Sequence, residues 1–304
     1  MRFSLIVATI GRTIELKSLL ESLGRQRYCN FEVIVVDQNT DGRLLPVLRS
    51  FESRIEIRRI ESAPGLSRAR NVGLRAVSGE VVCFPDDDCT YPDGLLRHVN
   101  ELLSTNSEWD GVVGDSVDNS GKPTLPWRDR EGRLTFPVSW RRAISYAIFM
   151  RTGVIRRIGG FDETLGVGAG SPWGSGEDND LVLRALKAGC YFQYDPNTRV
   201  CHPTLFPVLN AAVQAKRYSY ALGDGKLLQK HRMPLWWKLL FFSVPLARAG
   251  LAAARLKGRE VRFHWLTVKG RMNGFFSSEH EGAVPFPLAS EATPARARAA
   301  STAK

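Results

Sequence analysis

Short apolar runs alternate with amphipathic stretches over the first 84 residues of the chain. The apolar runs have few polar positions, as is typical of strands buried on both faces of a sheet, whereas leucines at helical spacing fill the first stretch between them. The expected strands are residues 3–8, 31–36, 55–60 and 80–84, and the expected helices are residues 16–23, 44–51 and 66–77. This alternation with short connections predicts an α/β fold with a mostly parallel central sheet and flanking helices.

The alternation loosens after residue 88. Prolines and glycines between residues 118 and 142 indicate loops with short strands. The remaining expected strands are residues 109–116, 144–150, 191–194 and 199–200, and the remaining expected helices are residues 153–158, 181–188 and 207–231. The neutral body of the chain is expected to end with residues 201–203.

Polar side chains follow three of the expected strands at the point where each strand ends. Thr9 follows the first strand, Asp37 follows the second, and Asp86, Asp87 and Asp88 follow the strand at residues 80–84. Ligands of parallel α/β sheets bind outside the carboxyl ends of the strands. We therefore expect these residues to converge on one edge of the sheet.

The three consecutive acids at residues 86–88 repel one another unless a positive charge lies among them. A divalent cation is the simplest compensator, and carboxylate oxygens suit Mg²⁺ or Mn²⁺, which usually also hold substrate phosphates. From this stretch alone, a solvated acidic turn, or an acidic lead-in to a helix starting near Pro92, explains the triplet equally well.

The expected helix at residues 66–77 contains an arginine, Arg70, on its apolar face. A buried arginine needs a partner, and either a phosphate or one of the nearby acids would serve. The alternative is that Arg70 extends along its aliphatic stem to reach solvent.

A glycine-rich stretch, residues 166–176, precedes the acids Glu177 and Asp178. Such a loop is flexible and can close over a ligand, and its Trp173 could offer that ligand an apolar face. Acids in the first turn of a helix also favour the helix dipole. The dipole accounts for one or two of these acids but not for the glycines or the tryptophan, so we predict a functional role for Glu177 and Asp178.

The net charge of +11 lies entirely in the C-terminal third. Residues 1–202 contain 26 basic and 26 acidic residues, whereas residues 203–304 contain 16 basic and 5 acidic ones. Such asymmetry indicates contact with a negatively charged surface, either membrane lipid or nucleic acid. Tryptophan, leucine and phenylalanine between residues 235 and 247 suit a helix lying in a membrane interface. Packing against protein and, less readily, a membrane span are the alternatives for this segment.

The five cysteines are scattered without a CxxC pair, which fits a reducing compartment better than a disulfide framework or a zinc site. The apolar run at residues 3–10 is too short for a signal peptide. We therefore expect a cytoplasmic protein, peripheral on the cytoplasmic face of the membrane. The Ala/Arg/Ser/Pro-rich tail at residues 279–304 is expected to be disordered.

In their order along the chain, these motifs resemble those of family 2 glycosyltransferases, which are inverting enzymes with a GT-A fold. Single motifs of this kind are weak, but the ordered set at family-like spacing over residues 3–203 is specific. The motifs are the opening strand and turn, Val35-Val36-Asp37, Ala69-Arg70-Asn71-Val72-Gly73, Asp86-Asp87-Asp88, Gly160-Phe161-Asp162-Glu163 and Gly176-Glu177-Asp178.

The resemblance implies a donor site for a nucleoside-diphosphate sugar. Thr9 and Asp37 would hold the nucleotide base, and Arg70 and Asn71 would lie close to the donor. Asp86 and Asp88 form an Asp-x-Asp motif with Asp87 as a spacer. In this motif, Asp86 would approach the ribose and Asp88 would ligate Mg²⁺ or Mn²⁺.

The resemblance also implies the catalytic end of the site. Asp178 would be the catalytic base, Glu177 would orient the acceptor or the loop, and His202 would join Asp88 as a metal ligand. A lone histidine is otherwise more often structural. Cys89 stands where the family often has an aspartate, and Gln38-Asn39 where it often has another acid, so the local loop geometry and the base selectivity stay open.

The resemblance predicts metal-dependent, inverting transfer to a hydroxyl of a sugar or lipid-linked acceptor, in polysaccharide or glycolipid synthesis. The expected divisions are a catalytic domain at residues 1–203, a helical basic extension at 204–278 and the tail at 279–304. A nucleotidyltransferase would need a basic glycine-rich loop after the first strand, where only Gly11-Arg12 stands. A nucleic-acid-binding module using the basic third is the other alternative; because that third carries no known nucleic-acid motif, we expect no nucleic-acid partner.

Overall fold

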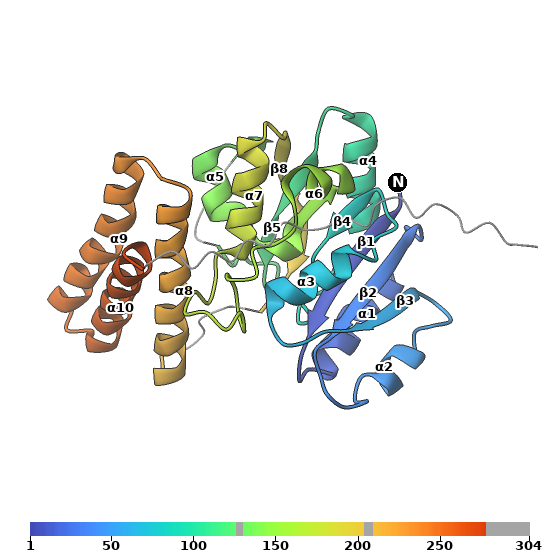
Figure 1. Cartoon of the computed structure of the whole chain (residues 1–304), viewed down its shortest axis with the longest axis horizontal. Coiled ribbons are helices and arrows are strands. Elements are labelled where there is room, and N and C mark those ends of the chain that lie inside the picture. Colours follow the sequence, from blue (N-terminus) through green and yellow to red (C-terminus); the bar gives the residue numbers. More distant parts are fainter. Residues whose placement is uncertain (126–129, 204–208, 278–304) are drawn as a thin grey trace, which may run out of the picture.

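The computed structural model describes residues 1–125, 130–203 and 209–277, and its centre is an eight-stranded mixed sheet (Figure 1). The strand order is β3-β2-β1-β4-β7-β5-β8-β6. The strands are β1 (Phe3–Thr9), β2 (Phe31–Asp37), β3 (Glu56–Glu61), β4 (Val81–Cys83), β5 (Gly111–Val117), β6 (Gly132–Arg133), β7 (Ile148–Arg151) and β8 (Phe192–Cys201). The expected tail at residues 279–304 lies outside the described residues.

Helices connect and cover these strands. They are α1 (Ile14–Gly24), α2 (Leu45–Arg49), α3 (Leu66–Leu74), α4 (Leu95–Thr105), α5 (Phe136–Arg142), α6 (Thr152–Ile158), α7 (Glu177–Lys187), α8 (Ala211–Lys230), α9 (Leu235–Ala254) and α10 (Gly258–Phe275), with a 3₁₀ turn η1 (Ser145–Ala147). Strands β1 to β4 pair with one another only in parallel, and β5 pairs in parallel with β8. Because β7 runs antiparallel between β4 and β5, the sheet is mixed but mostly parallel, which confirms the predicted α/β class.

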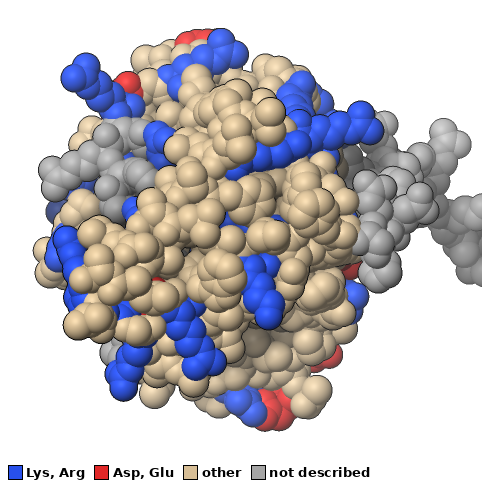
Figure 2. Space-filling view, turned by 90° about the vertical axis from the view of Figure 1, so that its left-hand side faces the viewer, with Lys and Arg blue, Asp and Glu red and all other residues tan. Residues whose placement is uncertain are grey.

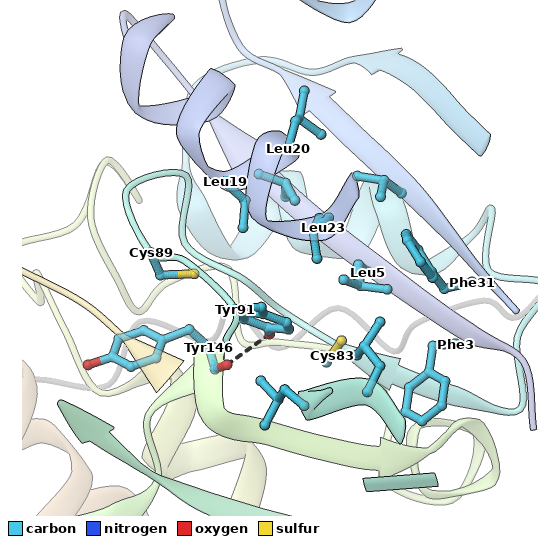
Figure 3. Packing of buried hydrophobic residues seen from close by; sticks show 14 of the residues in the cluster. Phe3, Leu5, Leu19, Leu20, Leu23, Phe31, Cys83, Cys89, Tyr91 and Tyr146 are labelled. Carbon is cyan, nitrogen blue, oxygen red and sulfur yellow. Dashed lines mark hydrogen bonds between the residues drawn. The ribbon is translucent and has the colours of Figure 1, made fainter. Parts of the chain in front are cut away.

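The sheet is buried on both faces because apolar side chains follow one another along its central strands. Leu5 and Val7 point to the face covered by α1 and α4, whereas Ile6 points to the face covered by α3, α6 and α7. Figure 3 shows the apolar cluster on the face covered by α1 and α4. In it, the Tyr91 hydroxyl donates a hydrogen bond to the Tyr146 carbonyl at 2.9 Å. The parallel pairing of β1 with β2 and β4 aligns the carboxyl ends of these strands.

Three local expectations were wrong. Residues 136–142 form α5 where loops and short strands were expected, because Pro137 fits the first turn of a helix and Trp140 packs against the ring of Trp237 in α9. The two late strands are one strand, β8, which pairs with β5 across an irregularity of register. Helix α7 begins at Glu177 rather than at residue 181.

Helices α8, α9 and α10 gather at one end of the molecule, with α8 nearest the sheet (Figure 1). Leu183 of α7 packs with Leu228 and Trp237 in a small apolar cluster that joins this end to the body. Most of α9 remains exposed: only 17% of its most apolar window is buried, and the helix is long and apolar enough, by length and composition alone, to cross a membrane. The division of the chain at residue 203 stays a prediction.

Candidate active site

The carboxyl ends of β1, β2 and β4 bring the predicted polar residues to one edge of the sheet. Parallel pairing sets Thr9 directly beside Asp37, and the acids at residues 86–88 follow β4. On the other side, backbone hydrogen bonds between Thr90 and Cys201, of 2.9 and 3.0 Å, hold the end of β8 against the loop after β4. His202 therefore lies beside Asp88 although the two are far apart in sequence.

The two residues predicted to hold the nucleotide base are engaged by protein groups. Asp37 is fully buried, and its carboxylate accepts hydrogen bonds from Arg59 Nε at 2.7 Å and from the Asn39 backbone at 2.9 Å. The Thr9 hydroxyl donates to Asp87 Oδ2 at 2.7 Å. Both side chains thus fix the strand ends, and their contact with a nucleotide base stays a prediction.

Asp87 is not the passive spacer that the sequence suggested. Its carboxylate accepts the hydrogen bond from Thr9 and a second one from Arg12 Nη1 at 2.7 Å. The same Arg12 nitrogen lies 2.5 Å from Asp88 Oδ2. Arg12 therefore compensates two acids of the triplet, and burial nevertheless raises the pKa of Asp87. The only sequence signal for Arg12 was a basic residue in the turn after the first strand.

Asp86, Asp88 and His202 form a set of groups that suits a metal ion, with their ligand atoms within 4.8 Å of one another. His202 Nε2 lies 3.1 Å from Asp88 Oδ1 and 3.8 Å from Asp86 Oδ2. Its Nδ1 lies 2.6 Å from the Pro203 carbonyl, which can only accept, so Nδ1 carries a proton and Nε2 is the nitrogen that could bind a metal ion. Tyr146 stacks on the imidazole at 4.6 Å and fixes its plane.

The two carboxyl groups of this set have opposite pKa shifts. Burial raises the pKa of Asp86 to about 6, and the negative charges of Asp178 and Asp88 add to the shift. Although burial acts in the same direction on Asp88, His202 and Arg12 lower its pKa to about 2. Asp88 is thus the permanently charged member, and a bound cation would hold Asp86 in its charged form as well.

Arg70 joins the candidate metal-binding set to the acids at the start of α7. The guanidinium group is 2% exposed, and its nitrogens donate to Asp178 Oδ1 at 2.8 Å and to Asp86 Oδ1 at 3.1 Å. A further bond, of 2.6 Å, reaches the Ser145 hydroxyl. Arg70 is therefore a buried cation with acidic partners, as one of the two sequence interpretations predicted, and it does not extend to solvent.

Asp178 is held by two donors at the start of α7. Besides the bond from Arg70, its Oδ2 accepts from the Ser145 backbone at 2.9 Å. The turn before it depends on Gly176, which has φ +103° and no room for a Cβ, because a Cβ would lie 2.9 Å from Leu227. The orientation of Asp178 thus depends on η1, which the sequence had assigned to a strand at residues 144–150.

Glu177 is 8% exposed and is the other acid at the start of α7. Burial and the neighbouring charge of Asp178 raise its pKa to about 8. Within the described part of the chain, Glu177 Oε2 has no hydrogen-bond partner. The raised pKa favours the protonated form of Glu177 near neutral pH, and this form can donate a hydrogen bond.

Two predicted residues lie away from the centre of the site. Trp173 is 2% exposed, packs on Leu165 and Leu227, and has Lys226 Nζ 4.5 Å from its ring centre, so it does not offer a free face to a sugar. Asn71 accepts from the Phe161 backbone at 2.8 Å and donates to its carbonyl at 2.9 Å. Asn71 thus holds the turn after α6 instead of facing the acids beside Arg70.

These acids open into a cavity of about 600 Å³. Arg70, Asp86, Asp178 and His202 line one end, and the cavity continues between the body of the molecule and helices α8 to α10. The size is in the range of sites that enclose a small organic ligand. The sequence analysis placed these four residues in one site, and they do line the same cavity. It gave no sign that the C-terminal helices complete that cavity.

Residues 4–158 match the family described as glycosyl transferase family 2. Over 190 residues the sequence is 32% identical to a pre-mycofactocin glycosyltransferase of Mycobacterium tuberculosis, covering 56% of this chain and 37% of that protein. Over 105 residues it is 30% identical to an Escherichia coli UDP-Glc:α-D-GlcNAc-diphosphoundecaprenol β-1,3-glucosyltransferase, covering 34% of this chain and 42% of that protein. The matches thus span less than half of each relative.

Among solved structures, the fold is similar to that of a mannosyltransferase from Pyrobaculum calidifontis in complex with GDP-Man and Mn²⁺. The TM-score is 0.63 at 15% sequence identity, over 91% of this chain and 88% of that one. At this identity the likeness concerns the fold alone, and it confirms the predicted GT-A fold.

Proposed function

The chain belongs to glycosyl transferase family 2, and we propose that it transfers a sugar from a nucleoside-diphosphate sugar to a hydroxyl group of an acceptor. One observation carries the proposal. Arg70 pairs with both Asp86 and Asp178 inside a cavity that His202 also lines. A donor-side acid and a candidate base are thus held at a fixed separation by one buried cation.

Asp86, Asp88 and His202 are the residues that would hold Mg²⁺ or Mn²⁺. Two carboxylates and an imidazole whose Nε2 faces them fit such an ion, and Mn²⁺ is named in the complex of the Pyrobaculum enzyme. When bound, a divalent cation offsets the negative charge of a diphosphate leaving group. Arg70 would add a positive charge on the same side of the cavity.

Asp178 is the proposed base of a single displacement. The acceptor hydroxyl oxygen forms a bond to C1 of the sugar while the bond from C1 to the diphosphate breaks, and the hydroxyl proton passes to the Asp178 carboxylate. Attack opposite the leaving group inverts the anomeric centre. The two hydrogen bonds on Asp178 orient it before the acceptor arrives. Glu177, neutral at its raised pKa, would donate a hydrogen bond to the acceptor or to the loop.

The nucleotide base and the sugar remain open in this proposal. The Escherichia coli relative is named for UDP-Glc and the Pyrobaculum enzyme for GDP-Man, so both bases occur among similar proteins. We propose that the nucleotide base binds beside Thr9 and Asp37, at the edge of the sheet that these two side chains hold in place.

We place the enzyme on a membrane surface through its C-terminal helices. Figure 2 views this end of the molecule, where lysine and arginine side chains are spread over an otherwise uncharged surface with few acids. Residues 209–277 carry 13 basic residues and two acids, and Leu235, Trp236 and Leu239 of α9 are exposed. Such a surface suits anionic lipid on the cytoplasmic face. A lipid-linked acceptor would then be within reach, as the name of the Escherichia coli relative suggests.

The test replaces Asp178 by asparagine and measures transfer from UDP-, GDP- and dTDP-sugars with Mn²⁺ present. Loss of a general base should lower the rate about 100-fold or more, whereas binding of the donor should change little. Asp93→Asn, an exposed loop acid, is the matched control. Full turnover by Asp178→Asn would overturn the assignment of the base, and absence of any nucleotide-sugar binding by the unaltered protein would overturn the proposed function.

A further inference from the structure

The far end of the cavity has a different chemistry from the catalytic end. Helix α8 contributes Arg217 and Asp224, α9 contributes Arg248, and α10 contributes His264 and Arg271. Three arginines there face a single acid, whereas at the catalytic end the two charged acids Asp86 and Asp178 outnumber the single arginine, Arg70. The cavity is thus negative at one end and positive at the other.

One carboxylate serves two of the three arginines. Asp224 Oδ2 lies 3.0 Å from Arg217 Nη2 and 3.4 Å from Arg271 Nε. Arg217 also donates to the Thr267 hydroxyl at 3.0 Å, and Arg271 donates to the Phe241 carbonyl. These contacts hold both guanidinium groups in place, so they form a rigid wall of the cavity.

Arg248, the third arginine, does not share the Asp224 carboxylate. It is exposed on α9 and lines the cavity, and the described residues include no acidic partner for it. Its charge acts on its neighbours instead: burial lowers the pKa of His264, and the charges of Arg248 and Arg217 lower it further. Burial also lowers the pKa of Arg271 to about 10, with Arg217 and Arg248 adding to the shift and Asp224 opposing it. This end therefore holds more positive charge than its own acid balances.

We propose that this basic end binds a phosphate or diphosphate group carried by the acceptor. A guanidinium group can donate two parallel hydrogen bonds to phosphate oxygens. A bound anion would also neutralise the positive charge that Asp224 alone does not compensate. The inference rests on the proposed function, which places the hydroxyl end of the acceptor near Asp178. The acceptor would then be a sugar phosphate or sugar diphosphate that spans the cavity.

Two features favour a lipid-linked phosphate over a soluble one. Val244, Pro245 and Phe263 line the same end of the cavity and offer apolar surface beside the arginines. Arg248 belongs to α9, whose exposed leucines and tryptophan form the proposed membrane face. A phosphate at Arg248 would thus lie where a lipid chain could leave the cavity toward the membrane.

The test measures binding of decyl diphosphate by calorimetry to the full chain, in EDTA so that no metal at Asp86, Asp88 and His202 attracts the diphosphate. We expect Arg248→Ala to weaken binding at least tenfold and Arg248→Lys to weaken it less. Arg255→Ala is the matched control, because Arg255 is an exposed arginine at the end of α9 that does not line the cavity. It should bind within twofold of the unaltered protein.

Two further ligands separate the sources of the anion. Decyl glucoside, which has the chain without the charge, should bind at least tenfold more weakly than decyl diphosphate. Pyrophosphate that binds as tightly as decyl diphosphate would support the anion site with a soluble acceptor, and weaker binding would support a lipid-linked one. Equal binding of decyl diphosphate by Arg248→Ala and the unaltered protein, or no binding by either, would overturn the inference.

The same variants separate this inference from the proposed function. Arg248→Ala should retain nucleotide-sugar binding with Mn²⁺, measured separately, because Arg248 lies outside the acids of the donor side. Diphosphate binding that depends on Arg248 in a protein that binds no nucleotide sugar would leave the anion site standing and the proposed glycosyl transfer refuted.

Discussion

The two ends of the cavity carry opposite excess charge. At the edge of the sheet, Asp86 and Asp178 both pair with Arg70, so the charged acids outnumber the cation. Between the C-terminal helices, Asp224 stands among arginines and the cations outnumber the acid. Each end is balanced only in part by the protein itself, which is the state expected of a site that a charged ligand completes.

The two ends also differ in what holds their charged side chains in place. The acids at the sheet edge are fixed by strand register and by a fully buried arginine. The basic end depends on the packing of three helices, which join the body through side-chain contacts such as the hydrogen bond from the Ser175 hydroxyl to the Tyr220 carbonyl at 2.9 Å. The following changes, from the largest expected effect to the smallest, test whether the two ends differ in this way.

Arg70→Met should lower the free energy of unfolding by about 3–5 kcal/mol, because Asp86 and Asp178 would lose their buried counter-charge. Urea denaturation measures the change. Arg68→Met, two residues earlier on α3 and half-exposed beside Glu163, should cost less than about 1 kcal/mol. Similar losses in both variants would mean that Arg70 is an ordinary surface ion pair.

Asp88→Ala should lower metal-dependent release of nucleoside diphosphate by about 100-fold or more, since a ligand of the metal is lost. Asp87→Ala should cost about tenfold, because Asp87 positions Thr9 and Arg12 but is not among the metal-binding set. Titration of Mn²⁺ separates the two, because only Asp88→Ala should raise the Mn²⁺ concentration needed for half-maximal rate. Equal shifts of that concentration would contradict the division of roles.

Asp180→Asn should lower the free energy of unfolding at pH 7 by about 2 kcal/mol, because buried Asp180 accepts bonds from Arg184 Nε at 2.8 Å and His231 Nε2 at 2.9 Å. Lys230 Nζ lies 2.7 Å from the same carboxylate, so Asp180 joins α7 to α8. Although burial opposes the shift, these partners lower the pKa of Asp180 below its ordinary value.

This depressed pKa has a consequence for acid stability. Above about pH 4 the carboxylate contributes its full stabilisation, and the contribution is lost as the pH falls toward the folded-state pKa. The Tm of the unaltered protein should therefore fall between about pH 4 and pH 2, and Asp180→Asn should flatten that fall. An unchanged acid slope in the variant would show that Asp180 does not carry it.

Trp236→Glu should reduce co-sedimentation with phosphatidylserine-containing vesicles about fivefold, because Trp236 is an exposed aromatic residue on the proposed membrane face. Ile14→Glu is the matched control, an exposed apolar residue on α1 at the other end of the molecule. Equal binding by Trp236→Glu and the unaltered protein would instead favour contact of α9 with another protein.

Strand and helix alternation, the convergence of Thr9, Asp37 and the acid triplet, and the pairing of His202 with Asp88 could all be predicted from the sequence. The first follows from apolar periodicity, and the second from the rule that ligands lie at the carboxyl ends of parallel strands. The third came from the resemblance to a family, since no local signal connects residues so far apart. These features are the ones that short segments or an ordered motif set encode.

Only the tertiary structure decided which charges meet. Asp87 binds Arg12, Trp173 is buried beneath Lys226, and Asn71 holds the turn at Phe161, because packing brings each side chain to a neighbour that the sequence does not identify. The basic end of the cavity is the clearest case. The sequence by itself determined that the C-terminal third is positive, but the packing of α8, α9 and α10 decided that three of its arginines line the same cavity as Asp86 and Asp178.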